Sequence, residues 1–210
     1  MDIPNAADTR AVGFDLDLTL VDTRERILAS AVNAFADLGA SIPAEAIVPH
    51  LGIPLADKVA ALAPALDTPA FVAAYRDHYH RPQAPQSPAM PGALAALQAV
   101  RAAGDRAIVV TAKIEWMGRG AVTEAGLADE LDAVHGSLFA LDKATALLAE
   151  GAWVYVGDHP GDIHAAHAAD AVAVGVTTGA NDEAALRAAG ADVVLESLTE
   201  FAAWYAQARP

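Results

Sequence analysis

Residues 11–22 read AVGFDLDLTLVD, and this stretch decides the fold expected for the chain. The apolar residues from Ala11 to Phe14 stop abruptly at the carboxylates Asp15 and Asp17. A continuous apolar run is typical of a strand buried on both faces of a parallel sheet. Ligands of open parallel sheets bind at the carboxyl ends of the strands. We therefore expect Asp15 and Asp17 to lie in a binding crevice.

Strands and helices alternate through the second half of the chain. Helical patterns cover 93–103, 118–125, 144–149, 163–169 and 182–189. Short apolar runs between them predict strands at 107–111, 133–135, 154–156, 172–176 and 192–195. Such alternation implies a parallel sheet whose crossover connections are right-handed.

Residues 23–90 have a different pattern, with helical periodicity and no convincing strand. Helices are predicted around 27–38, 56–66 and 70–79, and a proline-rich stretch at 81–92 forms a stiff connector. The expected fold is thus α/β, a three-layer Rossmann-like core with a parallel sheet, made of residues 1–22 and 91–210. Residues 23–90 would form an α-helical cap inserted into it.

The composition excludes several kinds of function. The 210 residues include 13 Lys and Arg against 27 Asp and Glu, which gives a formal net charge of −14. Such an acidic chain lacks the basic footprint that nucleic acids or anionic membranes require. Cys is absent, so disulfides, thiolate nucleophiles and Cys-ligated zinc are excluded. With neither a signal-like N-terminus nor a long apolar span, the expected localisation is cytoplasmic.

Further polar residues follow the other predicted strands. Thr111 ends the second strand, Lys143 stands at a helix start, and Asp158 and Asp162 follow a later strand. Carboxylates that converge in one crevice repel one another unless a cation neutralises them, and Mg²⁺ suits such oxygen ligands when shared with a phosphate. Thr111 and Lys143 supply a hydroxyl and a positive charge for an anionic group.

The order of these residues resembles a known family. Four segments look like the four signature motifs of the haloacid dehalogenase superfamily: Asp15-x-Asp17-x-Thr19, Val109-Val-Thr111, Lys143, and Gly157-Asp158-x-x-x-Asp162. The helical insertion after the first motif is similar to the cap of the phosphoglycolate phosphatase-like branch. The resemblance covers essentially the whole chain.

The resemblance implies a Mg²⁺-dependent phosphatase that hydrolyses a small phosphate monoester through an aspartyl-phosphate intermediate. Asp15 corresponds to the nucleophile and Asp17 to the general acid and base. Thr111 and Lys143 correspond to the residues that bind the phosphate. The presence of Asp17 argues against dehalogenation, because the dehalogenating members lack an aspartate there.

The resemblance also implies a set of metal ligands. Asp15, the main-chain carbonyl of Asp17, and Asp158 correspond to Mg²⁺ ligands. Asp162 is either a further ligand or a residue that orients Lys143 or metal-bound water. The expected partner is a small phosphorylated metabolite, with the chain acting as a monomer or homodimer.

Two positions depart from the pattern of the branch. Leu18 stands where most members have Gly, and Lys143 is followed by Ala144 rather than Pro. Lys113, two residues beyond Thr111, is therefore a rival for the phosphate-site cation. Its alternative interpretation is a surface lysine or one just outside the site.

Other candidates leave two interpretations open. In the cap, His50 and Lys58 are either substrate contacts or solvated loop residues. His164 and His167 can share a helix face, but exposed polar residues explain them better than a zinc site. Two functions from other classes also remain: a phosphomutase that returns the phosphoryl group to a sugar, and a non-catalytic phosphate-binding module.

Overall fold

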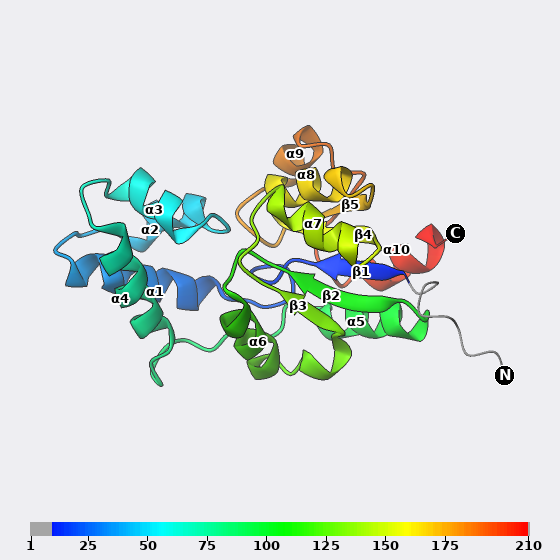
Figure 1. The fold of residues 1–210 in the computed structure, drawn as a ribbon, viewed down its shortest axis with the longest axis horizontal. Coiled ribbons are helices and arrows are strands. Elements are labelled where there is room, and N and C mark those ends of the chain that lie inside the picture. Colours follow the sequence, from blue (N-terminus) through cyan, green and yellow to red (C-terminus); the bar gives the residue numbers. More distant parts are fainter. Residues whose placement is uncertain (1–9, 210) are drawn as a thin grey trace.

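The computed structural model describes residues 10–209, and a six-stranded parallel sheet lies at its centre (Figure 1). The spatial order of the strands is β3-β2-β1-β4-β5-β6, so the first strand of the chain is central. The bounds are Ala11–Phe14 for β1, Arg106–Val110 for β2, Ala133–His135 for β3, Ala152–Gly157 for β4, Val172–Val176 for β5 and Val193–Leu195 for β6. The predicted parallel α/β fold is confirmed.

Helices cover both faces of this sheet and make the three layers. They are α5 (Ala93–Ala102), α6 (Glu115–Glu124), α7 (Asp142–Ala149), α8 (Pro160–Ala168), α9 (Glu183–Ala188) and α10 (Phe201–Ala208). Val12 and Phe14 of β1 pack in the hydrophobic cluster that contains α5 and α10 residues, whereas Ala11 packs in the cluster of α7, α8 and α9. Burial on both faces explains why the strands are continuously apolar.

Most predicted elements exist, with shifts of a few residues at their ends. Two elements of this core were not expected, α10 and the short 3₁₀ turn η2 (Ala128–Glu130), and a third unexpected element, the 3₁₀ turn η1 (Val48–His50), lies outside the core. Helix α10 is held by ring contacts, with Phe201 at 5.3 Å from Phe14 between ring centroids. That contact joins opposite ends of the chain, so the local sequence pattern does not predict the helix.

Four helices form a separate group at one end of the molecule, on the left of Figure 1. We call them the cap helices: α1 (Arg24–Asp37), α2 (Ala44–Ile47), α3 (Leu55–Leu62) and α4 (Thr68–Tyr79). They share a hydrophobic cluster of their own, in which Phe35 and Phe71 lie 4.4 Å apart between ring centroids. The unexpected α2 is one turn long, and α3 ends before Pro64.

The two connections between the cap helices and the sheet lie side by side. Asp22 donates its backbone N–H to Pro88 at 2.8 Å, and Met90 donates to Leu20 at 2.9 Å. Val21 and Ala89 form an antiparallel bridge between them. The chain therefore enters and leaves the cap helices through one paired hinge.

Leu18 connects the loop after β1 with the cap helices. Its φ is +63°, a left-handed conformation that disfavours residues with a Cβ. Its side chain is 1% exposed and packs in the hydrophobic cluster of the cap helices. Burial of the leucine side chain thus offsets the backbone strain. This explains how Leu can stand at a position where the phosphoglycolate phosphatase-like branch most often has Gly.

We expect Leu18→Gly to lower the free energy of unfolding by about 1–4 kcal/mol. Loss of a buried leucine costs about 2–5 kcal/mol, and relief of the left-handed strain returns about 1 kcal/mol. Urea unfolding measures the change. Leu18→Ala is the matched control, because it removes the same packing but keeps the Cβ. A Gly variant more stable than the parent would show that strain outweighs packing.

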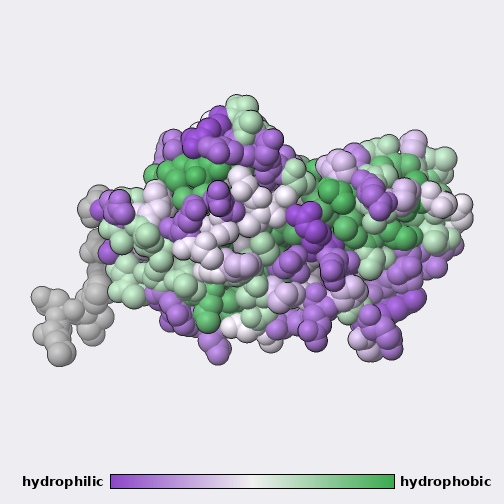
Figure 2. Space-filling view, turned by 180° about the vertical axis from the view of Figure 1, so that it is seen from behind, coloured by the Kyte–Doolittle hydropathy of each residue, from purple (hydrophilic) through white to green (hydrophobic). Residues whose placement is uncertain are grey.

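None of the helices within residues 10–209 is long and apolar enough to cross a membrane. Figure 2 shows polar residues distributed over the rear face, with hydrophobic side chains gathered in separate patches rather than in a belt.

Candidate active site

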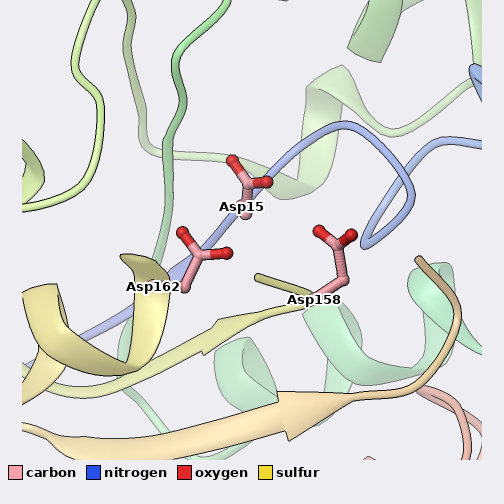
Figure 3. Close-up of side chains that lie close together, drawn as sticks. All are labelled: Asp15, Asp158 and Asp162. Atoms are coloured by element: carbon pink, nitrogen blue, oxygen red, sulfur yellow. The ribbon is translucent and has the colours of Figure 1, made fainter. Parts of the chain in front are cut away.

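Three buried carboxylates meet at the carboxyl ends of the central strands. Asp15 directly follows β1, Asp158 directly follows the neighbouring β4, and Asp162 lies in the first turn of α8. Figure 3 shows their side chains pointing toward one another, and each offers an oxygen within 4.8 Å of the others. Their exposed fractions are 8%, 2% and 3%. The structure thus brings together residues that lie almost 150 positions apart in the sequence.

Small residues make room for these carboxylates. A Cβ at Gly179 would overlap the carboxylate of Asp158, and a Cβ at Gly157 would overlap that of Asp162. The Thr19 hydroxyl donates to Asp158 Oδ1 at 3.3 Å, and the Asn181 amide donates to the Asp158 backbone carbonyl at 3.2 Å. Neither Asn181 nor Gly179 was predicted to be part of the site, since both lie outside the four motifs.

Lys143 binds two of the three carboxylates. Its Nζ donates to Asp15 Oδ1 at 2.8 Å and to Asp162 Oδ1 at 2.7 Å. A third bond, at 2.9 Å, runs to the hydroxyl of Tyr155, which in turn donates to the Val110 carbonyl at 2.6 Å. Burial alone would lower the pKa of Lys143, but the carboxylates of Asp15 and Asp162 raise it well above its ordinary value. Lys143 is therefore a charged ammonium fixed inside the site.

Asp162 is already engaged on both of its oxygens. Oδ1 accepts from Lys143, and Oδ2 accepts the backbone N–H of His159 at 3.1 Å. The His159 ring accepts the Gly161 N–H at 3.0 Å, which completes a capping box at the start of α8. These bonds favour the interpretation in which Asp162 orients Lys143 over the one in which it is a metal ligand.

Asp15 and Asp158 retain oxygens that fit a hard cation. Burial raises the pKa of Asp15 to about 6, Lys143 opposes this shift, and the Asp162 carboxylate adds to it. Burial also raises the pKa of Asp158 well above its ordinary value, and the carboxylates of Asp15 and Asp162 add to that shift. A divalent cation with oxygen ligands would relieve this mutual repulsion, and carboxylate donors are those that Mg²⁺ prefers.

Asp17 points toward a second lysine. Its Oδ1 lies 3.1 Å from Lys113 Nζ, and it is buried without a hydrogen bond to any residue from 10 to 209. Lys113 also donates to the hydroxyl of Tyr79, on α4, at 3.2 Å. Burial lowers the pKa of Lys113, but Asp17 and Tyr79 raise it above its ordinary value overall. The interpretation of Lys113 as a surface lysine is wrong.

The remaining candidates fall into two groups. Thr111, just beyond β2, is buried at the site, and Lys58, on α3, is 2% exposed, so Lys58 is no solvated loop residue. His50 is half-buried at the end of η1 and makes no side-chain hydrogen bond within residues 10–209. His164 and His167 are exposed on α8, as expected for solvated polar residues, and His167 pairs with Asp192 at 3.3 Å.

A small cavity of about 20 Å³ lies among these groups. Its lining contains Asp15, Asp17, Thr111, Lys143 and Asp162 from the sheet side, and Gly52 from the loop before α3. This space is about that of one water molecule and cannot hold a phosphate ester. Gly52 is part of this lining, so the loop before α3 reaches the site, and a phosphate ester needs more room than this arrangement offers.

Comparisons with known proteins agree with this geometry. A sequence profile described as haloacid dehalogenase-like hydrolase matches residues 12–176. No curated protein is similar enough in sequence to match.

Solved structures share the fold at low sequence identity. A predicted phosphatase from Clostridium acetobutylicum superposes with a TM-score of 0.84 at 22% identity, over 95% of this chain and 99% of that chain. A predicted phosphoglycolate phosphatase from Haemophilus somnus gives 0.80 at 21% identity, over 97% and 100%. A candidate β-phosphoglucomutase from Thermotoga maritima gives 0.72 at 18% identity, over 96% and 100%.

Proposed function

The chain belongs to the haloacid dehalogenase-like hydrolases, and on this premise we propose that it is a Mg²⁺-dependent phosphatase acting on a small phosphate monoester. One observation carries the proposal. Lys143 binds Asp15 and Asp162 in a buried site, and beside them the Asp158 carboxylate accepts a hydrogen bond only from the Thr19 hydroxyl among residues 10–209. This arrangement suits a nucleophilic carboxylate that receives a phosphoryl group.

Asp15 would act as the nucleophile. Its Oδ1 is held by Lys143, and Oδ2 makes no hydrogen bond within residues 10–209. An Asp15 oxygen attacks phosphorus, the bond between phosphorus and the ester oxygen breaks, and an aspartyl-phosphate forms. Asp17 gives its proton to the departing alkoxide, which leaves as an alcohol.

Asp17 would then act as a base. It takes a proton from a water molecule whose oxygen attacks the aspartyl-phosphate. The bond between phosphorus and Asp15 breaks, which frees inorganic phosphate and restores both carboxyl groups. Asp17 Oδ1 makes no hydrogen bond within residues 10–209, and Lys113 Nζ, 3.1 Å away, supplies a positive charge that stabilises the carboxylate form after the proton has left.

The remaining groups would bind the phosphoryl oxygens. Asp15, Asp158 and the Asp17 carbonyl would hold Mg²⁺, which neutralises negative charge on the transferring phosphoryl group. Thr111 offers its hydroxyl and Lys143 its ammonium to the same oxygens. In this proposal residues 1–22 and 91–210 form the catalytic core, and 23–90 form a cap that opens for substrate and closes over it.

A phosphomutase is the second candidate. The small size of the cavity favours it, since a mutase must keep water away from its aspartyl-phosphate, and one structural relative is a candidate β-phosphoglucomutase. Incubation with sugar phosphates separates the two: a phosphatase releases inorganic phosphate, whereas a mutase forms an isomeric sugar phosphate.

Removal of the metal tests the proposal. We expect chelated enzyme to lose at least about 100-fold in phosphate release from a panel of phosphate esters, and added Mg²⁺ to restore it. Mg²⁺ should also raise the midpoint of thermal unfolding, because it binds only the folded site. Asp15→Asn protein purified in parallel measures the background from contaminants. Release that is insensitive to chelation would contradict the proposed role of Mg²⁺.

A further inference from the structure

The side chains that line the active-site cavity have few hydrogen-bond donors to spare. A lysine ammonium carries three hydrogens, and ionised carboxylates only accept. Three acceptors already surround the Nζ of Lys143, on Asp15 at 2.8 Å, Tyr155 at 2.9 Å and Asp162 at 2.7 Å. Lys143 thus supplies charge to the cavity but has no uncommitted hydrogen. A transferring phosphoryl group has several oxygens that accept hydrogen bonds, so further donors are needed.

His159 lines the same cavity, and one of its ring nitrogens is free. Nδ1 accepts the Gly161 N–H at 3.0 Å, so Nδ1 carries no hydrogen. The single hydrogen of the neutral ring then lies on Nε2. Nε2 makes no hydrogen bond within residues 10–209 and is not one of the fully buried polar atoms there. Apart from Thr111, His159 is the only residue of this lining with a side-chain N–H or O–H that no other described residue accepts.

The ring of His159 is held in place from several directions. Its own backbone N–H donates to Asp162 Oδ2 at 3.1 Å, within the capping box of α8. The Phe139 ring lies 5.9 Å away between ring centroids, and a Cβ added at Gly52 would lie 3.5 Å from Cδ2 of the imidazole. The loop before α3 therefore passes against one edge of the ring. A donor fixed in this way loses little conformational freedom when it binds a ligand.

We propose that His159 donates its Nε2–H to a phosphoryl oxygen of the substrate, which makes it a catalytic residue of this site. This hydrogen bond adds to the one offered by the Thr111 hydroxyl. A neutral donor suits a site in which Lys143 already supplies a buried positive charge, since a second buried cation beside it would be costly. The inference rests on the phosphatase function proposed above and deepens it by adding a residue that contacts the transferring group.

Two amide variants separate the roles of the two ring nitrogens. An Asn side chain places its oxygen near the position of Nδ1 and can cap α8, but it does not reach the position of Nε2. A Gln side chain places its amide N–H near the position of Nε2. We expect His159→Asn to lower kcat/KM for the preferred ester of the panel by about 10- to 100-fold, while the midpoint of thermal unfolding stays within about 2 °C of the parent. His159→Gln should regain at least about 5-fold of that loss, because the donor returns.

Binding of inorganic phosphate gives a readout that needs no turnover. With Mg²⁺ present, the dissociation constant of phosphate measured by calorimetry should rise by about 10-fold in His159→Asn and less in His159→Gln. In protein labelled with ¹⁵N-histidine, phosphate should shift the Nε2 resonance that is missing from His159→Asn. His164→Asn is the matched control and should match the parent in both measurements, because His164 is exposed on the same helix and does not line the cavity.

Two results would overturn the inference. His159 is only a helix cap if His159→Asn keeps the kcat/KM and the phosphate affinity of the parent. The Nε2–H has no role if His159→Gln is as impaired as His159→Asn. Failure of the proposed function would look different: the parent would release no more phosphate than Asp15→Asn from any ester, whatever the phosphate affinity of the His159 variants.

Discussion

Replacing Asp15 by Asn is expected to reduce phosphate release by about 10⁴-fold or more, since loss of a covalent nucleophile leaves little of the rate enhancement. The amide has nearly the same size as the carboxylate but is a poor nucleophile. Lys143 keeps its bond to Asp162 at 2.7 Å, so the lysine stays in place. The rate is measured as inorganic phosphate released from a saturating ester in the presence of Mg²⁺.

Two further measurements make this result specific. Acid quenching during turnover of an ester labelled in its phosphoryl group should trap label on the parent protein and none on Asp15→Asn. Asp22→Asn is the matched control, because the Asp22 side chain is exposed and, within residues 10–209, accepts a hydrogen bond only from the Arg24 backbone N–H at 3.3 Å. More than about 1% of parent activity in Asp15→Asn would contradict the assignment of the nucleophile.

The parts of the fold that could be predicted are strands whose apolar sequence follows from their burial. β1, β3 and β5 begin and end at the predicted residues, because strands covered on both faces must be continuously apolar. Helix ends were less predictable, since packing rather than propensity fixes them. α3 ends at Leu62 rather than Leu66, and α10 depends on contacts with β1 that no local pattern shows.

The site could be predicted as a set of residues but not as a set of pairs. Motif order indicates that Asp15, Lys143 and Asp158 belong together. The resemblance offers one pairing, Asp162 with Lys143, as an alternative, but it does not indicate that Lys143 also binds Asp15 or that Lys113 pairs with Asp17, because these pairings depend on how α7 and the loop after β2 approach the sheet. Tyr155 was not predicted to be part of the site, because it lies inside an apolar strand. Its hydroxyl accepts a hydrogen bond from Lys143.

The same limit applies to the cap helices. From the sequence, Lys58 is either a substrate contact or a solvated loop residue, and nothing in its neighbours Asp57 and Val59 decides between the two. In the structure its side chain is 2% exposed, and Gly52, in the loop before α3, lines the cavity among the carboxylates. The burial of Lys58 therefore could not be predicted from the sequence, because it depends on how the cap helices pack in the folded chain.

Lys143 and Lys113 allow a direct comparison of two buried cations. We expect Lys143→Met to lower the free energy of unfolding by about 3–5 kcal/mol, because it leaves the buried carboxylates of Asp15 and Asp162 without a counter-charge. We expect Lys113→Met to cost less, about 1–2 kcal/mol, since its partner Asp17 is a single and less buried carboxylate. Urea unfolding of metal-free protein measures both.

We expect Lys143→Met and Lys113→Met to differ more in kcat than in their free energies of unfolding. Lys143→Met removes the cation beside the proposed nucleophile and should reduce kcat by about 10³-fold, the usual effect of losing a charge that stabilises the transition state. Lys113→Met acts only through Asp17 and should reduce it by about 10- to 100-fold. Rates are measured at a temperature where both variants are folded by circular dichroism. A larger loss in Lys113→Met would make Lys113 the phosphate-site cation, because each lysine contacts a different carboxylate and the larger effect identifies the one on the reacting group.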